Sequence, residues 1–193
     1  MVGAQINFLV VGHHSRRNVA TVLAESLNAS LLIDEADHGA AWNHRRAIEW
    51  AATQSGRVVI LEDDAMPVAG FNEEVAAWLN RFPDDLLSFY LGTGRPPQWQ
   101  SEIKRKLASN PQFITLPTLI HGVCYSIPRQ HVQRILDKWP QHLAADYAVG
   151  RAWGGDVIYP AYSLVDHADG ESVERHPDGE RRTEVRRAWQ LAS

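Results

Sequence analysis

The sequence contains a single cysteine, Cys124, which excludes an intramolecular disulfide bond and a metal cluster built from cysteines. Long hydrophobic runs are also missing: nowhere do roughly 18 apolar residues follow one another, so no membrane-spanning helix is predicted. The first residues lack a basic segment followed by a long apolar run, and no signal peptide is predicted. These absences favour a protein of the cytoplasm.

Positive charge is not in excess either. The 19 Lys and Arg residues stand against 23 Asp and Glu residues, for a formal net charge of -4. No overall basic character therefore indicates a nucleic acid or an anionic membrane as partner. The chain of 193 residues, 45% hydrophobic and 22% charged, suits one globular domain with a full core. We see no internal repeat and no linker that would divide it.

Strand and helix patterns alternate through the first half of the chain. The apolar runs predict strands at 6–11, 31–33, 58–61, 86–91, 118–127 and 156–160. Helical spacing predicts helices at 18–27, 40–53, 71–82, 101–109, 128–139 and 143–153. The βαβαβ order of the first five elements predicts a parallel sheet with a Rossmann-like half. The expected fold class is a single α/β domain with a mixed central sheet.

The most informative stretch is Val58-Val59-Ile60-Leu61-Glu62-Asp63-Asp64-Ala65. A buried strand here ends in three consecutive carboxylates, which lie where open α/β sheets bind ligands. Crowded acids repel one another, and a hard divalent cation with oxygen ligands would remove that cost. The alternative is that they cap the next helix, but that helix is predicted to begin near Gly70, and Glu62 and Asp64 come too early for it.

The loop after the first strand favours an anion. Gly12, His13 and Arg16 belong to the turn Gly12-His13-His14-Ser15-Arg16-Arg17, which precedes a helix and would present backbone N–H groups to a phosphate. Arg16 and Arg17 add donors suited to phosphate oxygens. The turn is not a Gly-x-Gly-x-x-Gly fingerprint and lacks the lysine of a phosphate loop. A solvated helix start is the alternative.

Two further residues are candidates for the nucleotide side of this edge. Asp34 closes the second strand, a position that commonly meets a ribose or a base, although a polar strand end before a turn is equally expected. Arg45 lies in the next helix, whose start faces the same edge. We rank it above its neighbour His44, because a lone helical histidine is more often packed or solvated.

The acidic motif, with Asn43-His44 in the preceding helix, resembles glycosyltransferases of the GT-A fold. Among these the chain is most similar to the lipooligosaccharide and collagen galactosyltransferase group, which has a Leu-Glu-Asp-Asp-Ala pattern. The segment Gly122-Val123-Cys124-Tyr125 resembles that group's Gly-x-x-Tyr, and Ala145-Asp146-Tyr147 resembles its later segment with an essential Asp. Asn43 replaces the group's usual Ser, and the chain is short for the group.

The resemblance implies metal-dependent transfer of a sugar from a nucleotide diphosphate, with UDP as the favoured nucleotide and inversion at the sugar carbon. Mn²⁺ or Mg²⁺ would bind Glu62 and Asp64, completed by His167, with His176 as the alternative. Asp63 would lie near the ribose or donor sugar, and Gly122 would allow close approach of that sugar. Asp146 would be the general base, the alternative being an exposed helical acid.

Other functions fit parts of the pattern. A nucleotidyltransferase also uses carboxylates at strand ends but usually has a Gly-rich phosphate loop, and a sugar-nucleotide-binding module could keep the fold without the chemistry. The acceptor could be a saccharide, a protein or a modified DNA base. The source could be a bacterium or a phage, and a phage-encoded protein would be located in the host cytoplasm. Residues 1–65 would bind the nucleotide sugar, 66–170 the acceptor, and 171–193 form a tail. The sequence does not fix the oligomeric state.

Overall fold

The computed structural model describes residues 5–168 and 185–192. Its strands are β1 (Ile6–His13), β2 (Ser30–Asp34), β3 (Arg57–Glu62), β4 (Ala65–Pro67), β5 (Leu86–Ser88), β6 (Phe113–Leu116), β7 (Cys124–Ile127), β8 (Val157–Pro160) and β9 (Val165–His167). Its helices are α1 (Arg17–Leu27), α2 (Ala40–Thr53), α3 (Phe71–Arg81), α4 (Pro97–Leu107), α5 (Val132–Asp137) and α6 (Ala145–Trp153), with short 3₁₀ turns η1 (His14–Arg16) and η2 (Arg129–His131).

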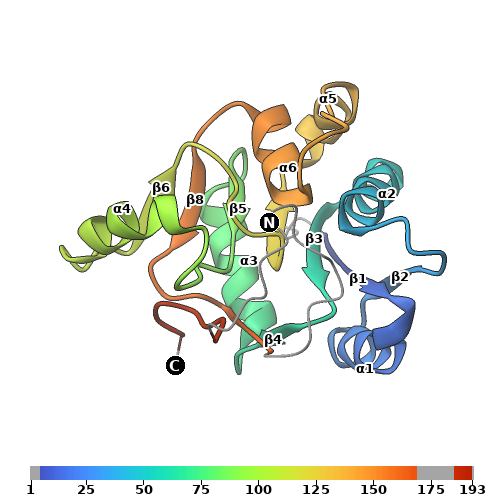
Figure 1. Cartoon of the computed structure of the whole chain (residues 1–193), viewed down its shortest axis with the longest axis horizontal. Helices are drawn as coiled ribbons and strands as arrows, with labels where there is room; N and C mark the ends of the chain where they lie inside the picture. The colour runs from blue at the N-terminus through green and yellow to red at the C-terminus, as the bar shows by residue number, and fades with distance from the viewer. Residues whose placement is uncertain (1–4, 169–184, 193) are drawn as a thin grey trace.

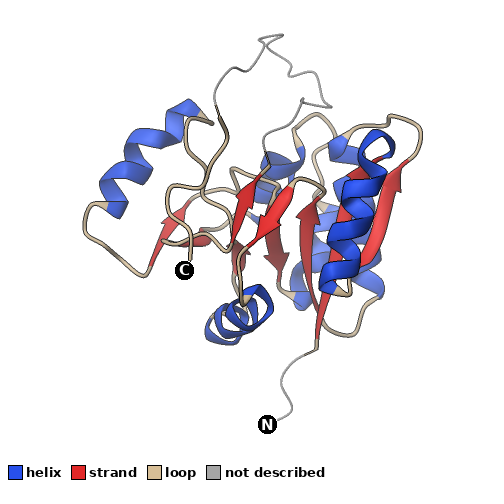
Figure 2. Ribbon diagram, turned by 90° about the horizontal axis from the view of Figure 1, so that it is seen from below, coloured by secondary structure: helices blue, strands red, loops and turns tan. Residues whose placement is uncertain are grey.

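Seven strands form one mixed sheet in the order β2-β1-β3-β7-β5-β8-β6 (Figures 1 and 2). The first three strands are parallel, with Leu9 opposite Ser30 and Ile6 opposite Arg57. Strand β7 then runs antiparallel to β3. The predicted βαβαβ unit and the mixed sheet of a single α/β domain are therefore confirmed. No helix among the described residues is long and apolar enough to cross a bilayer.

Helices cover both faces of the sheet (Figure 1). On one face α2 contacts α5 and α6, and its buried residues Ala47, Ile48 and Ala51 follow the helical spacing expected of a core-facing stripe. On the other face α1 and α3 pack, α1 through a stripe that includes Ala20 and Leu27. Helix α4 lies to the side, beside β6 (Figure 1).

A separate two-stranded ribbon joins distant parts of the chain. Strand β4, directly after the acidic motif, pairs antiparallel with β9, and Ala65 lies opposite His167. The backbone N–H of Ala168 donates to the carbonyl of Asp64 over 2.8 Å, which extends this pairing by one step. The ribbon therefore holds residues 165–168 against the segment that follows β3.

Several element boundaries differ from the predictions. The strand predicted at 118–127 is confined to Cys124–Ile127, and β6 at Phe113–Leu116 was not predicted. Strand β5 stops at Ser88 rather than at 91. Helix α4 begins at Pro97 instead of 101, since proline suits a first helical position. The helix predicted at 128–139 is a 3₁₀ turn followed by the short α5.

Candidate functional site

Three acids meet at the carboxyl ends of β1 and β3. These strands run parallel with Val11 opposite Glu62, so the loop after β1 and the acidic motif lie at the same edge of the sheet. Asp63 is buried and Glu62 is partly buried, its side chain 29% exposed. The edge predicted from the sequence is therefore the edge at which these residues gather.

Glu62 is held by a buried histidine. The Nε2 atom of His44 lies 3.1 Å from Oε1 of Glu62, and its Nδ1 lies 2.9 Å from the hydroxyl of Tyr125. Burial acts to raise the pKa of Glu62, but the hydrogen bond and the electrostatic attraction of His44 lower it on balance. The carboxylate is consequently fixed in one orientation and kept ionised.

Gly122 makes room for this carboxylate. A Cβ atom at Gly122 would lie 2.5 Å from Oε1 of Glu62 and 3.3 Å from the ring of His44. We expected the missing side chain to let a sugar approach. The structure fills that space with Glu62, so the glycine positions an acid of the cluster instead.

Asp63 binds the loop after β1. Its Oδ2 accepts a hydrogen bond from the backbone N–H of His13 at 3.0 Å, and its Oδ1 accepts one from Arg16 at 3.0 Å. Gly12 allows this close approach, because a Cβ there would lie 3.3 Å from Asp63 and 2.8 Å from Ala20. Gly12, His13 and Arg16 are thus brought to the acid cluster as predicted, and Asp63 fastens their loop rather than pointing into an open ribose site.

Asp64 has one oxygen in contact and one without a partner. Oδ2 lies 2.8 Å from Arg16 and 3.5 Å from Nε2 of His167. Oδ1 is buried and forms no hydrogen bond with any residue that the structure describes. Burial, with the charge of Glu62 next, raises the pKa of Asp64. An ionised oxygen in that environment is costly unless a cation or donor meets it.

His167 is presented to Asp64 in a defined orientation. The residue is buried, and its Nδ1 lies 2.8 Å from the carbonyl oxygen of Ala168, so Nδ1 carries the proton that this contact requires. Nε2 faces Oδ2 of Asp64 at 3.5 Å. A metal-binding histidine commonly has this arrangement, in which the distal nitrogen donates to a carbonyl and the other binds the ion. His176, the alternative ligand, lies outside the described residues.

The donor set suits a divalent cation. Asp64 and His167 face one another at the end of β3, and Glu62 is close enough for its charge to raise the pKa of Asp64. The ligand atoms of these three described side chains do not all lie within 4.8 Å of one another, so an ion would draw them together. Mn²⁺ accepts such mixed oxygen and nitrogen ligands, and Mg²⁺ accepts the carboxylates with water or phosphate oxygens in addition. Glu62, Asp64 and His167 are therefore the residues that could hold the ion.

Asp146 lies in the first turn of α6 and is partly buried. It accepts a hydrogen bond from the backbone N–H of Tyr147 at 2.8 Å. Burial raises its pKa to about 6, Glu62 adds to the rise and His44 opposes it. These electrostatic effects indicate that the carboxyl senses the acid cluster, and its pKa leaves it largely ionised at neutral pH.

Two predicted site residues have other partners. Asp34 is buried and accepts hydrogen bonds from the N–H groups of Ala36 and Gly39, so it organises the turn after β2, as in the alternative interpretation. The same contacts, acting against burial, lower its pKa to about 2. Arg45 pairs with Glu49 one turn along the surface of α2. Neither contact brings these residues to the acid cluster.

One histidine of this region was ranked too low from the sequence, and another was not considered. His44, ranked below Arg45, is 1% exposed and contacts Glu62 directly. His121 is also close enough for Glu62 to influence it, but burial lowers its pKa to about 3, and its Nε2 accepts a hydrogen bond from the N–H of Gly92 at 3.2 Å. Helical spacing could have found His44, because it lies one turn before the buried Ile48.

Trp153 is the last residue of α6. Its indole N–H donates to the carbonyl of Asp156 at 3.0 Å, and Gly154 ends the helix in the left-handed conformation with φ 71°, which is a common way for a helix to stop. Asp156 itself is exposed.

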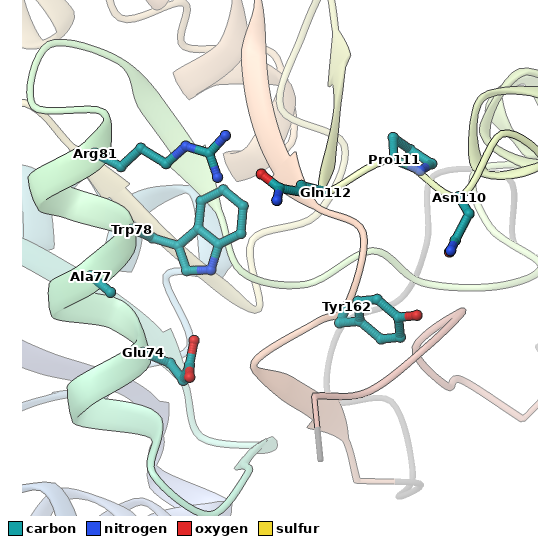
Figure 3. Close-up of a pocket in the computed structure, with 8 residues that line it drawn as sticks. All are labelled: Glu74, Ala77, Trp78, Arg81, Asn110, Pro111, Gln112 and Tyr162. Atoms are coloured by element: carbon teal, nitrogen blue, oxygen red, sulfur yellow. The ribbon is translucent and has the colours of Figure 1, made fainter.

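A shallow surface groove of about 480 Å³ lies between α3 and the loops around β6 and β8 (Figure 3). The residues that line it are Glu74, Ala77, Trp78, Arg81, Asn110, Pro111, Gln112 and Tyr162. None of the residues predicted for the site belongs to this groove.

Comparison with known proteins gives a likeness of fold. The sequence matches no model of a protein family and no curated protein. Among solved structures, the chain is similar to the crystal structure of A197 from STIV, with a TM-score of 0.60 and 14% sequence identity. The match covers 97% of this chain and 95% of that one. At this identity the likeness shows a shared α/β fold over nearly the whole chain.

Proposed function

We propose that the protein is a metal-dependent glycosyltransferase, which moves a sugar from a nucleotide diphosphate, UDP in preference, to a hydroxyl acceptor. One observation carries this proposal: His167 lies 3.5 Å from Asp64, whose second oxygen is buried and has no partner among the described residues. Together with Glu62, these residues would supply the ligands for Mn²⁺ or Mg²⁺ at the edge where α/β sheets commonly bind ligands.

The ion would act as a Lewis acid on the diphosphate, whose negative charge grows as the sugar leaves. Arg16 lies 2.8 Å from Asp64. Once a divalent ion binds the carboxylates, the guanidinium of Arg16 would donate hydrogen bonds to the same phosphates instead. Backbone N–H groups of the turn after Gly12 would assist it. His44 would keep Glu62 ionised and in place throughout.

Asp146 is the proposed general base. A carboxyl with a pKa of about 6 is ionised at neutral pH, yet is a stronger base than an ordinary aspartate. It would take the proton of the acceptor hydroxyl as that oxygen attacks the sugar carbon. Inversion at that carbon is expected from the resemblance alone, and the acceptor is a hydroxyl of a saccharide, a protein or a modified DNA base.

A panel experiment tests the proposal. The protein is incubated with UDP-, GDP- and CDP-sugars and Mn²⁺, with and without glycan acceptors, and the released nucleoside diphosphate is measured. We expect release with at least one donor, its loss in EDTA, and its loss in Asp64→Asn. Exposed Asp156→Asn is the matched control and should keep the wild-type rate.

The outcomes separate the candidate functions. Full release in EDTA would refute the metal dependence. Binding of a nucleotide sugar without release, with every acceptor, would indicate the non-catalytic module, and release of pyrophosphate from nucleoside triphosphates would indicate the nucleotidyltransferase. Cytoplasmic location and the nucleotide-sugar partner stay predictions.

A further inference from the structure

Two histidines and an acid meet on the outer side of the loop after β1. His13 and His14 both direct Nε2 towards Oδ1 of Asp37, His14 at 2.8 Å and His13 in a shorter contact. The three ligand atoms all lie within 4.8 Å of one another, and the two imidazole ring centres are 4.1 Å apart. This group, the His-His-Asp cluster, is distinct from the acids at the end of β3.

The fold builds this cluster from two ordered loops. Strands β1 and β2 are paired with His13 opposite Asp34, so the loops that follow them leave the sheet side by side. Asp34 accepts N–H groups from both ends of its turn, which fixes the segment between them. Asp37 adopts a left-handed backbone with φ 56° inside that segment. Its carboxylate is thereby held opposite the histidines, although it lies 24 residues beyond His13.

Contacts with Ser15 orient the imidazole of His13. Its Nδ1 accepts a hydrogen bond from the backbone N–H of Ser15 at 3.2 Å and lies 2.7 Å from Oγ of that residue. A metal ion at Nε2 would require the tautomer in which Nδ1–H donates to this hydroxyl, and Ser15 can accept that hydrogen bond. Metal-bound histidines are commonly fixed by such a partner on the distal nitrogen.

We propose that His13, His14 and Asp37 form a second cation site, which selects transition metals such as Zn²⁺ and is separate from the Mn²⁺ or Mg²⁺ site at Glu62 and Asp64. Two imidazoles and one carboxylate are a common ligand set for Zn²⁺, with water at the fourth position. In a tetrahedral site neighbouring ligand atoms are about 3.3 Å apart, which follows from metal–ligand bonds of about 2.0 Å.

The required movements are small. Both contacts to Asp37 would lengthen by a fraction of an ångström, while the histidine nitrogens, already within 4.8 Å of one another, would close around the ion. The side chains of His13, His14 and Asp37 are 20%, 40% and 69% exposed. Water can therefore reach the fourth coordination position of the ion. Mg²⁺ prefers oxygen ligands and should not compete at this site.

A metal here would join the loop after β1 to the loop after β2. The first of these loops also carries the N–H that Asp63 accepts, so the ion would fasten one wall of the acid cluster. The proposal does not depend on glycosyl transfer, because it needs only these three side chains.

Zn²⁺ titration of the full-length protein by calorimetry tests the site. The titration is made in the Asp64→Asn background, so that the acid cluster does not contribute. We expect one Zn²⁺ per chain, a loss of affinity of about tenfold or more in His14→Ala and again in Asp37→Ala, and no change in His142→Ala, an exposed histidine elsewhere. Added Mg²⁺ should not displace the Zn²⁺.

Two further measurements keep the result interpretable. Melting curves without metal should coincide for His14→Ala and the parent, since the replaced side chain is on the surface, and Co²⁺ should give a visible absorption band that disappears in the same variant. The site is refuted if His14→Ala and Asp37→Ala bind Zn²⁺ as the parent does, or if His142→Ala weakens binding as much as they do.

Discussion

Replacing Asp146 by Asn should stabilise the protein at neutral pH while removing its proposed function. The pKa of Asp146 is raised by burial to about 6 from a usual 3.8. The folded protein therefore binds this proton more tightly than the unfolded chain, and the penalty of ionising the group develops as the pH rises between these two values. Above about pH 6 the full penalty is present.

The size of the effect follows from the pKa. Each unit is worth about 1.4 kcal/mol, which sets an upper figure of about 3 kcal/mol for Asp146. Because the side chain is only partly buried by surface area, solvent screening reduces this to roughly 1–2 kcal/mol. For a domain of this size that corresponds to a melting temperature higher by about 2–8 °C.

Thermal melts of the wild type and Asp146→Asn across the pH range measure this directly. The variant should melt higher at neutral pH, and the difference should disappear below about pH 3, where both states of the wild type carry the proton. Asp156→Asn, an exposed aspartate, is the control and should melt as the wild type does at every pH. An Asp146→Asn protein that is no more stable at neutral pH would refute the burial argument. Separately, transfer should fall by about 10²- to 10⁴-fold while donor binding is kept.

Three further substitutions probe the site and its support. Gly122→Ala would bring a Cβ to 2.5 Å from Glu62 and displace that carboxylate, so Mn²⁺ affinity measured by titration should fall about tenfold or more, with the fold retained. His44→Ala removes the partner of Glu62 and should weaken Mn²⁺ by about 10- to 100-fold in the same assay. Arg57→Met leaves the carbonyls of the α3–β5 loop without their donor and should cost about 2 kcal/mol or more in urea unfolding, whereas exposed Arg105→Met should cost little.

Local patterns were sufficient for the parallel half of the sheet. The apolar run at residues 58–61 and the stripe of α1 each have one interpretation, and a βαβαβ order permits essentially one handedness. Because parallel strands end at the same edge, Gly12, Arg16 and the acids were predicted to meet, and they do. This prediction required only that the residues at which β1 and β3 end be recognised in the sequence.

The rest depended on contacts that local sequence does not encode. Strand β4 is three residues long and contains a proline, so nothing in it indicated a partner 100 residues away. The juxtaposition of His167 and Asp64 was expected only from the resemblance, and the ribbon is what produces it. Arg45 was preferred to His44 because a lone helical histidine is more often packed or solvated than a ligand, although Ala47, Ile48 and Ala51 already define the buried face of α2.

The charge balance of the cluster explains why a cation and a diphosphate should bind together. Glu62, Asp63 and Asp64 carry three negative charges when ionised, and the permanently positive Arg16 contacts Asp63 and Asp64. A divalent ion that binds Oδ2 of Asp64 competes with this guanidinium for the oxygen, which weakens binding of the ion by itself. A diphosphate offers the displaced Arg16 a new anionic partner and gives the ion further oxygen ligands. Each ligand therefore removes a cost from the other, and by linkage the enhancement of metal binding by nucleotide must equal the enhancement of nucleotide binding by metal.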